Sequence, residues 1–582
     1  MSAAGVVPLL DVVATAVSAA IARVRPEAAG TDPMVRRSDR ADFRSDAALP
    51  LARRSGTNPG ELAERLVAHF VPGESVERVA VSGPGFLNTA VADTALWKQV
   101  AARLDNPRLG VPANRTGQRV VVDYSGPNVA KEMHVGHLRT TIIGDSLVRV
   151  LGFLGAEVVR VNHLGDWGTQ FGMLIQYLDE HPDRPWRSGE STVSALDGLY
   201  KAARARFDTD LAFADRARAR VVALQSGDEA TTARWREIVA ESARAFDAIY
   251  TRLGVLLTAD DRVGESFYNP MLPETVAALL EVGVAEYSAG AVVVASREVN
   301  GPDGTPAVLI AHKSDGGCGY DSTDLATLRH RVTTLAAHRL LYVTDSRQAL
   351  HFRLVFEAAH RAGWLTDAVS AEHVTYGTIL GPDNKPFKTR AGGTVRLTDL
   401  LDAAVAAAAA VVAEKNPDLP AADLAAIAEQ AGIGAVKYAD LSTGRVKDYV
   451  FDPVRMTAFS GNTGVYLQYA HARIQGILVR AGDPARTPVD PTVALASAER
   501  ALVLTLDAHG AVIADVATTL EPHRLAGHLY DLARAFTAFY DTCPVLTAPE
   551  PVRANRLALC RLTAATLANG LDLLGIAAPT RM

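Results

Sequence analysis

The sequence predicts an α/β nucleotide-binding fold built on a parallel sheet, and three consecutive segments support this prediction. A β-branched run, Val120–Val122, is typical of a buried strand. Apolar residues then recur at helical spacing from Leu138 to Leu154, and a second β-branched run, Val158–Val161, follows. Strand, helix and strand over this length form a βαβ unit, which requires a parallel sheet and a right-handed crossover.

Composition narrows the class of protein. The chain has 582 residues, of which 48% are hydrophobic, and a formal net charge of −6. A single core rarely grows past roughly 250–300 residues, so we expect several domains. Because the chain is mildly acidic, any nucleic-acid surface must be a local patch. Three cysteines, Cys318, Cys543 and Cys560, have no paired spacing, which argues against a disulfide framework or a zinc ribbon and fits a reducing cytoplasm.

The first 25 residues are apolar, but Asp11 interrupts them and no basic region precedes them. We therefore expect an amphipathic helix of the first domain and not a signal peptide. We also expect that no apolar run is long enough to span a membrane.

The chemistry of the βαβ unit is expected at the first turn of its helix, in the motif His134-Val135-Gly136-His137. Two imidazoles three residues apart lie on one helical face, and the free N–H groups of a helix N-terminus attract phosphate. Gly136 lets a flat ring or a phosphate approach the backbone. The two histidines can then stabilise an anion whose charge rises in a transition state. The alternative is a pair that only packs or faces water, because short motifs recur by chance. No further ligand stands at zinc spacing, so no metal site is predicted.

In this setting HVGH resembles the HIGH signature of class I aminoacyl-tRNA synthetases. The surrounding segments DYSGPNVAKEMHVGHLRTTIIGD and NHLGDWGTQFGM resemble the arginyl-tRNA synthetase family. The resemblance recurs in the family's order at 264–270, 320–328, 342–356, 381–397, 461–474 and 521–582, and so covers nearly the whole chain. It implies a class I Rossmann-type nucleotide-binding catalytic domain with an insertion, an α+β N-terminal domain and an all-α C-terminal helix bundle.

Three domains are expected on this basis. Residues 1–117 would form an N-terminal domain that binds the elbow of a tRNA. Residues 118–444 would form the catalytic domain, in which charged helices at about 185–300 break the pattern and indicate an insertion. Residues 445–582 have a helical pattern throughout and would bind the anticodon.

Recognition of a guanidinium requires carboxylates placed for paired hydrogen bonds, because this group is planar and always charged. Asp324 is the best candidate, with Tyr320 one helical turn before it, Gln348 fixing orientation and Glu265 as a second acid. Each of them could also be an ordinary surface or capping residue. The resemblance implies that arginine is bound by Asn128, His137, Glu265, Tyr320, Asp324 and Gln348.

A basic loop bounded by glycine and proline, residues 381–390, contains Lys385, Lys388 and Arg390. Three cations in six residues suit a polyphosphate, and a flexible loop suits a lid that closes on a leaving group. The alternative is a solvated charged turn. The resemblance equates KPFKTR with the class I KMSKS loop, with Lys388 as its second lysine. It implies ATP binding by His134, Gly136, His137, Lys385 and Lys388, and catalysis by His134, His137 and Lys388.

Candidate tRNA contacts lie in both outer domains. Asn88 leaves the turn Gly83-Pro84-Gly85 on an extended segment. Tyr466, Tyr469 and Arg473 lie on one predicted helix, where aromatic and basic side chains can stack on and pair with bases, or can equally belong to a core.

The resemblance implies an arginine–tRNA ligase that uses ATP with Mg²⁺, L-arginine and tRNA(Arg), as a cytoplasmic monomer without a membrane partner. In this family the first step usually waits for bound tRNA. Two alternatives stay open. One is a paralogue that binds arginine or tRNA as a sensor or carrier, whose expected mark is a broken HVGH motif or basic loop. The other is an enzyme that supplies charged arginine to a biosynthetic pathway.

Overall fold

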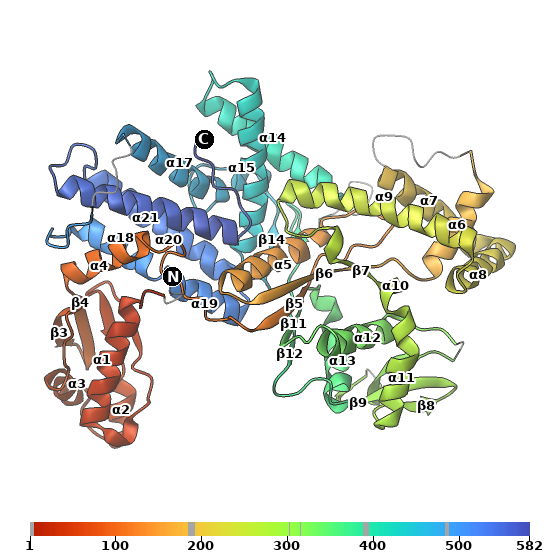
Figure 1. Ribbon diagram of the computed structural model, residues 1–582, viewed down its shortest axis with the longest axis horizontal. Coiled ribbons are helices and arrows are strands. Elements are labelled where there is room, and N and C mark those ends of the chain that lie inside the picture. Colours follow the sequence, from red (N-terminus) through yellow and green to blue (C-terminus); the bar gives the residue numbers. More distant parts are fainter. Residues whose placement is uncertain (1–4, 184–191, 302, 315, 388–394, 483–487) are drawn as a thin grey trace.

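A five-stranded parallel sheet lies at the centre of the protein, seen in a computed structural model that describes residues 5–183, 192–301, 303–314, 316–387, 395–482 and 488–582 (Figure 1). Its strand order is β12-β11-β5-β6-β7. The strands are β5 (Arg119–Asp123), β6 (Glu157–Leu164), β7 (Arg262–Gly264), β11 (Arg339–Tyr342) and β12 (Ser370–His373). The order reverses between β5 and β11, and in open α/β sheets ligands bind at such a switch point, beyond the carboxyl ends of the strands.

Helix α5, Gly136–Phe153, connects β5 to β6 and confirms the predicted βαβ unit. It is buried on nearly every side because the sheet packs against it from one direction and helices α15, α19 and α21 from another. Gly144 permits the close approach to the sheet, since a Cβ there would lie 2.3 Å from the Tyr124 side chain. The local sequence thereby fixes the distance of this helix from the sheet, and with it the position of the helix N-terminus.

Between β6 and β7 the chain forms a helical extension on the right of Figure 1. Its helices are α6 (Thr169–Glu180), α7 (Thr192–Thr209), α8 (Leu211–Gln225) and α9 (Glu229–Leu253). Strand β7 lies inside the range expected as an insertion, yet it joins the edge of the central sheet, where Val263 pairs with His163 of β6. The returning helix α9 also reaches the sheet, because the Tyr250 hydroxyl lies 2.7 Å from Ser125 Oγ in the loop after β5.

A second lobe follows β7 and ends with β11. It contains α10 (Glu265–Tyr268), α11 (Leu272–Glu281), the antiparallel strands β8 (Glu286–Ser288), β9 (Ala291–Asn300) and β10 (Pro306–His312), and helix α12 (Tyr320–Thr333). Helix α13 (Ala349–Arg361) then packs against α12 and β9 and leads to β12. The apolar faces of α11, α12, α13, β9 and β10 share one core with Leu340 and Tyr342 of β11, and Tyr268 of α10 packs in a separate small cluster.

The N-terminal domain is a four-stranded antiparallel sheet with helices, drawn in red at the lower left of Figure 1. It contains α1 (Leu9–Val24), β1 (Val35–Arg37), β2 (Phe43–Ser45), α2 (Ala48–Ser55), α3 (Pro59–Ala68), β3 (Val76–Ser82), β4 (Phe86–Val91) and α4 (Asp93–Leu104). Helix α4 joins it to the C-terminal helices, since Arg103 forms a buried ion pair with Asp507 at 2.7 Å. The mixed composition agrees with the predicted α+β domain.

The C-terminal region is almost entirely helical. Its helices are α14 (Leu397–Lys415), α15 (Ala421–Leu441), α16 (Pro453–Met456), α17 (Gly464–Arg480), α18 (Ser497–Asp507), α19 (His509–Thr519), α20 (His523–Thr542) and α21 (Val552–Leu573). The prediction of a wholly helical region from about 445 is wrong in one detail. Strand β14 (Tyr449–Val450) pairs in parallel with β13 (Ile379–Leu380), and so ties the start of the basic loop to the helical region.

Within the described residues, one stretch, Ser497–Thr519, is long and apolar enough to cross a membrane by length and composition. The expectation that no run is long enough is therefore wrong on those criteria. The stretch is folded as the two consecutive helices α18 and α19, and half of its most apolar window is buried inside the protein. It carries Arg500, which pairs with Asp93 at 2.6 Å, and buried Asp507, which pairs with Arg103.

Candidate active site

A cavity of about 640 Å³ opens at the carboxyl ends of β5, β6, β7 and β11. Each strand leads directly into residues that line it, as expected for a switch point in a parallel sheet. The lining includes eight of the residues predicted from the sequence: Asn128, His134, Gly136, His137, Glu265, Tyr320, Asp324 and Gln348. The fold thus brings the predicted phosphate-binding and guanidinium-binding groups to one place.

The two histidines of the HVGH motif lie together at the start of α5, and backbone N–H groups fix how their rings are protonated. The N–H of His134 donates to Nδ1 of His137 at 3.0 Å, and the N–H of Gly136 donates to Nδ1 of His134 at 3.1 Å. Because each Nδ1 accepts a hydrogen bond, the proton of a neutral ring must sit on Nε2. The ring centroids are 4.0 Å apart, so the motif presents two neighbouring Nε2–H donors.

Both imidazoles are neutral at physiological pH. Burial and the neighbouring His134 lower the pKa of His137 to about 3. Burial and the charges of Arg347 and Lys131 also lower the pKa of His134 from its ordinary value. The motif therefore supplies directional hydrogen-bond donors at a helix N-terminus, and the fixed charge must come from other groups.

The structure gives a reason for the glycine at position 136 that the sequence did not show. A Cβ at this position would lie 2.8 Å from the ring of His134. The glycine therefore leaves room for the His134 imidazole as well as for a ligand, and its own N–H holds that ring in place. The two roles are compatible because the residue is exposed at the helix start.

Glu265 and Asp324 bring two carboxylates into the same cavity. Glu265 is the first residue of α10, directly after β7, and Asp324 lies in the first turns of α12, after Tyr320. Burial, together with the negative charges of Asp166 and Asp324, raises the pKa of Glu265 to about 7. A carboxylate held near half-ionisation by burial and by neighbouring negative charge is stabilised in its ionised form by an incoming cation.

Asn128 and Gln348 flank these acids from two different loops. Asn128 bridges to Gly165, which follows β6, and a Cβ on Gly165 would lie 2.3 Å from Asn128 Oδ1. Gly165 thereby lets the Asn128 side chain sit against the backbone at the strand end. Gln348 closes a short 3₁₀ helix, Ser346–Gln348, and is exposed. Both amides line the cavity, where they can orient a polar substrate.

Some lining residues were not found from the sequence, of which His351 is the most informative. It lies on α13 with its Nε2 2.6 Å from Asp324 Oδ2. Its position three residues after Gln348 was the available signal, since residues three apart share one helical face. His163 and Arg347 also line the cavity.

The basic loop is only partly described. Lys385 is exposed in a tight turn, where its carbonyl accepts the N–H of Gly381 at 2.8 Å, and it is not among the residues that line the cavity. Lys388 and Arg390 lie outside the described residues. The predicted roles of these cations therefore remain predictions.

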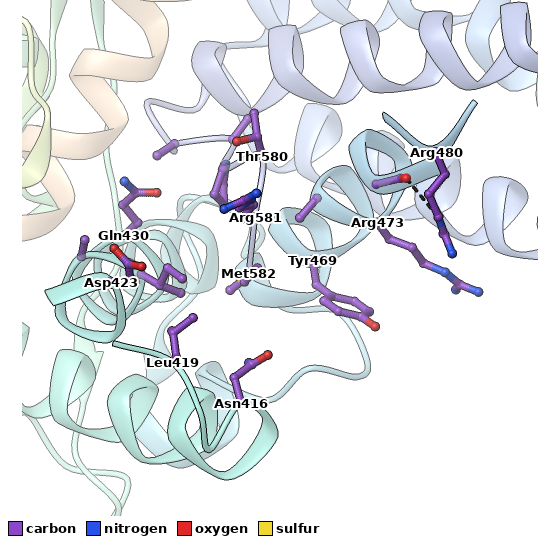
Figure 2. A pocket seen from close by; sticks show the side chains of 17 residues that line it. Asn416, Leu419, Asp423, Gln430, Tyr469, Arg473, Arg480, Thr580, Arg581 and Met582 are labelled. Atoms are coloured by element: carbon purple, nitrogen blue, oxygen red, sulfur yellow. Dashed lines mark hydrogen bonds between the residues drawn. The ribbon is translucent and has the colours of Figure 1, made fainter. Parts of the chain in front are cut away.

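A second cavity, of about 920 Å³, lies between α15, α17 and residues 577–582 (Figure 2). Figure 2 shows Tyr469 of α17 next to Met582 of the final segment, with the Arg473 side chain farther along α17 and extending away from that segment. Among its described lining residues three side chains are arginines and one, Asp423, is acidic, so the lining side chains carry an excess of positive charge. The guanidinium of Arg473 lies 4.3 Å from the ring centre of Tyr540.

The other two predicted tRNA contacts lie elsewhere. Tyr466 does not line this cavity, because its ring packs 5.8 Å from that of Tyr530. Asn88 lies on β4 of the N-terminal domain, where its Nδ2 donates to Ser82 Oγ at 2.5 Å. Its cross-strand neighbour Arg44 lies 4.3 Å above the ring of Phe86, which gives this sheet a polar and aromatic face.

Three family models match the chain. Residues 99–453 match the class I tRNA synthetase (R) catalytic domain. Residues 467–582 match the DALR anticodon binding domain, and residues 11–91 match the arginyl tRNA synthetase N-terminal domain.

Full-length relatives agree with these models. The arginine–tRNA ligase of Frankia casuarinae is 66% identical over 589 residues, and that of Streptomyces coelicolor is 53% identical over 586 residues, each covering 100% of both chains. The crystal structure of arginyl-tRNA synthetase from Plasmodium falciparum superposes with a TM-score of 0.83 at 28% identity, covering 99% of both chains. The chain therefore belongs to the arginyl-tRNA synthetase family of class I aminoacyl-tRNA synthetases.

Proposed function

We propose that the cavity at the carboxyl ends of the central strands is where this chain activates L-arginine with ATP before transferring it to tRNA(Arg). The chain is an arginine–tRNA ligase of class I. One observation carries the assignment of the site: a helix N-terminus with two Nε2–H donors and two carboxylates, Glu265 and Asp324, line a single cavity. The first set suits phosphates, and the second suits a cationic side chain.

In the first step the arginine carboxylate attacks the α-phosphorus of ATP, and pyrophosphate leaves as the new mixed anhydride forms. Mg²⁺ enters with ATP as part of the substrate. His134 and His137 donate hydrogen bonds to the phosphate oxygens, whose negative charge increases in the transition state. Gly136 keeps the helix start open to them. Lys385 and Lys388 of the basic loop neutralise the departing pyrophosphate when the loop closes.

Arginine is selected by its guanidinium. Asp324 and Glu265 receive its N–H groups, and the ionised Glu265 is favoured once the cation is present. Asn128, Tyr320 and Gln348, which line the same cavity, orient the substrate. His137 has a role in both regions, since it contacts the amino acid as well as the phosphates.

In the second step a ribose hydroxyl of the terminal adenosine of tRNA attacks the arginyl-adenylate carbonyl, and AMP leaves. In class I enzymes this is the 2′ hydroxyl, and no protein nucleophile is needed. The three units 1–117, 118–444 and 445–582 divide the work. The first binds the tRNA elbow through Asn88, and the last binds the anticodon through Tyr466, Tyr469 and Arg473. The excess of arginine over acid around the second cavity supports this placement.

The protein works in the cytoplasm as a monomer, without a membrane partner. Three free cysteines support a reducing compartment. The described residues of a single chain bring eight of the predicted site residues to the cavity, which supports the monomer. Light scattering coupled to size-exclusion chromatography tests the oligomeric state directly.

The test of substrate identity is ATP–pyrophosphate exchange with each amino acid in turn, with and without tRNA(Arg). We expect exchange with arginine alone among the twenty, and a requirement for tRNA(Arg). Exchange that is strongest with another amino acid would overturn the assignment. Binding of arginine or tRNA without exchange or charging would instead indicate a sensor or carrier, although the HVGH motif is intact.

A further inference from the structure

His351 of α13 lies between two carboxylates of α12. Its Nε2 is 2.6 Å from Asp324 Oδ2, and its Nδ1 is 3.3 Å from Asp321 Oδ1. A neutral imidazole has one N–H, so acceptors at both nitrogens favour the doubly protonated imidazolium. Although burial alone would lower it, the hydrogen bonds to Asp321 and Asp324 raise the pKa of His351 to about 9.

The ring of His351 is fixed from several directions. Asp321 is itself held, because the Ile310 N–H donates to its Oδ2 at 3.0 Å. The ring of Tyr320 lies edge-on at 5.0 Å and that of Phe352 at 5.3 Å. Only 16% of the His351 side chain is exposed. A ring with so little freedom can define where the carboxylate that it binds will point.

The fixed ring of His351 determines how Asp324 is presented to the cavity. His351 engages one oxygen, Oδ2, and so the second oxygen, Oδ1, is the one that a ligand in the cavity can reach. The imidazolium also offsets negative charge in a region that contains Asp321, Asp324 and, on α10, Glu265. Two other titratable groups face His351 among the described residues. One is the phenol ring of Tyr320, and the other is His373 of β12, whose pKa is lowered by burial and, to a smaller extent, by the charge of His351.

We propose that His351 is a positioning residue for arginine recognition: it holds Asp324 by one carboxylate oxygen so that the other meets the substrate guanidinium. It touches neither ATP nor the reacting atoms in this role. The inference rests on the proposed function of the cavity, and it adds a residue that acts through Asp324. It predicts that loss of the imidazolium affects binding of arginine and leaves binding of ATP unchanged.

The test uses the full chain with tRNA(Arg) and measures aminoacylation kinetics for His351→Ala, His351→Gln and Asp321→Asn. We expect His351→Ala to raise the KM for arginine about 10- to 100-fold, because a charge-assisted hydrogen bond is lost. The KM for ATP should stay within twofold. His351→Gln keeps a neutral hydrogen-bond donor, and its KM for arginine should be at least threefold lower than that of His351→Ala. Asp321→Asn should raise the KM for arginine about threefold to tenfold.

His360→Gln is the matched control, since His360 lies on the same helix but does not line the cavity. Its KM values should equal those of the unaltered chain. A KM for arginine within twofold of normal in both His351 variants would overturn the proposal. Equal rises in both KM values with a lowered melting temperature would also overturn it, by showing a purely structural role.

If His351→Ala does not fold, His351→Gln and Asp321→Asn decide by the same criteria. Failure of the unaltered chain to charge tRNA with arginine would contradict the proposed function. An active chain with unaffected variants would contradict only the role of His351.

Discussion

Arg139 of α5 and Asp440 of α15 form an ion pair that is almost completely excluded from solvent. Arg139 Nε lies 3.1 Å from Asp440 Oδ2, and the two side chains are 1% and 0% exposed. The guanidinium also donates to the Lys447 carbonyl at 2.8 Å and lies 5.4 Å from the ring centre of Tyr449. The helix that begins with the HVGH motif is thereby joined to the helical C-terminal region.

Breaking this pair should destabilise the protein strongly. Asp440→Asn leaves a buried guanidinium without its counter-charge, which typically costs about 3–5 kcal/mol. We expect a melting temperature several degrees lower by differential scanning calorimetry. The double variant Arg139→Met with Asp440→Leu should recover most of the loss, because an apolar pair of similar volume is often neutral. An unchanged melting temperature in Asp440→Asn would contradict the expectation.

Each histidine of the motif should act through its Nε2–H. His137→Ala removes this donor, and we expect the kcat of arginine-dependent ATP–pyrophosphate exchange to fall about 100- to 1,000-fold, as for other donors to a developing oxyanion. His137→Gln places an amide N–H near the Nε2 position and should lose less. The assay contains tRNA(Arg). A kcat within threefold of normal for His137→Ala would show that this ring does not stabilise the transition state.

Glu265 should give arginine binding a pH dependence. Its pKa is about 7 in the free protein, so the carboxylate is ionised above that pH and protonated below it. Only the ionised form attracts a guanidinium. The KM for arginine should therefore rise as the pH falls from about 8 to about 6, while the guanidinium stays charged throughout.

The control is Glu265→Gln, which cannot ionise. At about pH 8 we expect its KM for arginine to be on the order of tenfold higher, as for loss of a charge-assisted hydrogen bond. Its KM should also be nearly independent of pH. A pH profile identical to that of the unaltered chain would assign the titration to another group.

Asp324→Asn should separate amino acid recognition from nucleotide binding. The amide cannot pair ionically with a guanidinium or with His351, which lies 2.6 Å away. We expect the KM for arginine to rise by on the order of 100-fold or more, with the KM for ATP nearly unchanged. Steady-state aminoacylation measures both values. An unchanged KM for arginine would remove Asp324 from the binding site.

Substitutions in the second cavity should change the KM for tRNA alone. Loss of a stacking ring typically costs about 1–3 kcal/mol per base, so Tyr469→Ala should raise the KM for tRNA about tenfold. Arg473→Ala should raise it too and should weaken its dependence on salt. The KM for arginine should not change in either variant. Arg480→Ala is a useful comparison, since Arg480 lines the same cavity but its Nε is already bonded to the Gly476 carbonyl.

Prediction from the sequence succeeded where a local pattern marks an element. The βαβ unit could be predicted because α5 is long enough to show a helical period and because β5 and β6 each contain a β-branched run. Strand β7 could not, since a strand as short as Arg262–Gly264 has no measurable alternation. Its place beside β6 is what brings Glu265 to the cavity.

Two other features depend on tertiary contact. Helix α15 contains Gly432 and Gly434, which lower helix propensity and hide the pattern. The structure explains both, because a Cβ would lie 2.6 Å from Val405 in one case and 2.8 Å from Gln468 in the other. Likewise, the contact between His351 and Asp324 requires α12 and α13 to pack together, which no local pattern encodes.

The helical extension between β6 and β7 has one part that supports the cavity and one that lies farther from it. Helix α9 supports it, since Ser242 Oγ accepts the Ala130 N–H at 2.9 Å and the Tyr250 hydroxyl contacts the loop after β5. The turn between α8 and α9, around Gly227, is exposed. A fluorescent reporter domain grafted into that turn should leave catalysis intact, which makes this position a suitable attachment point for a label.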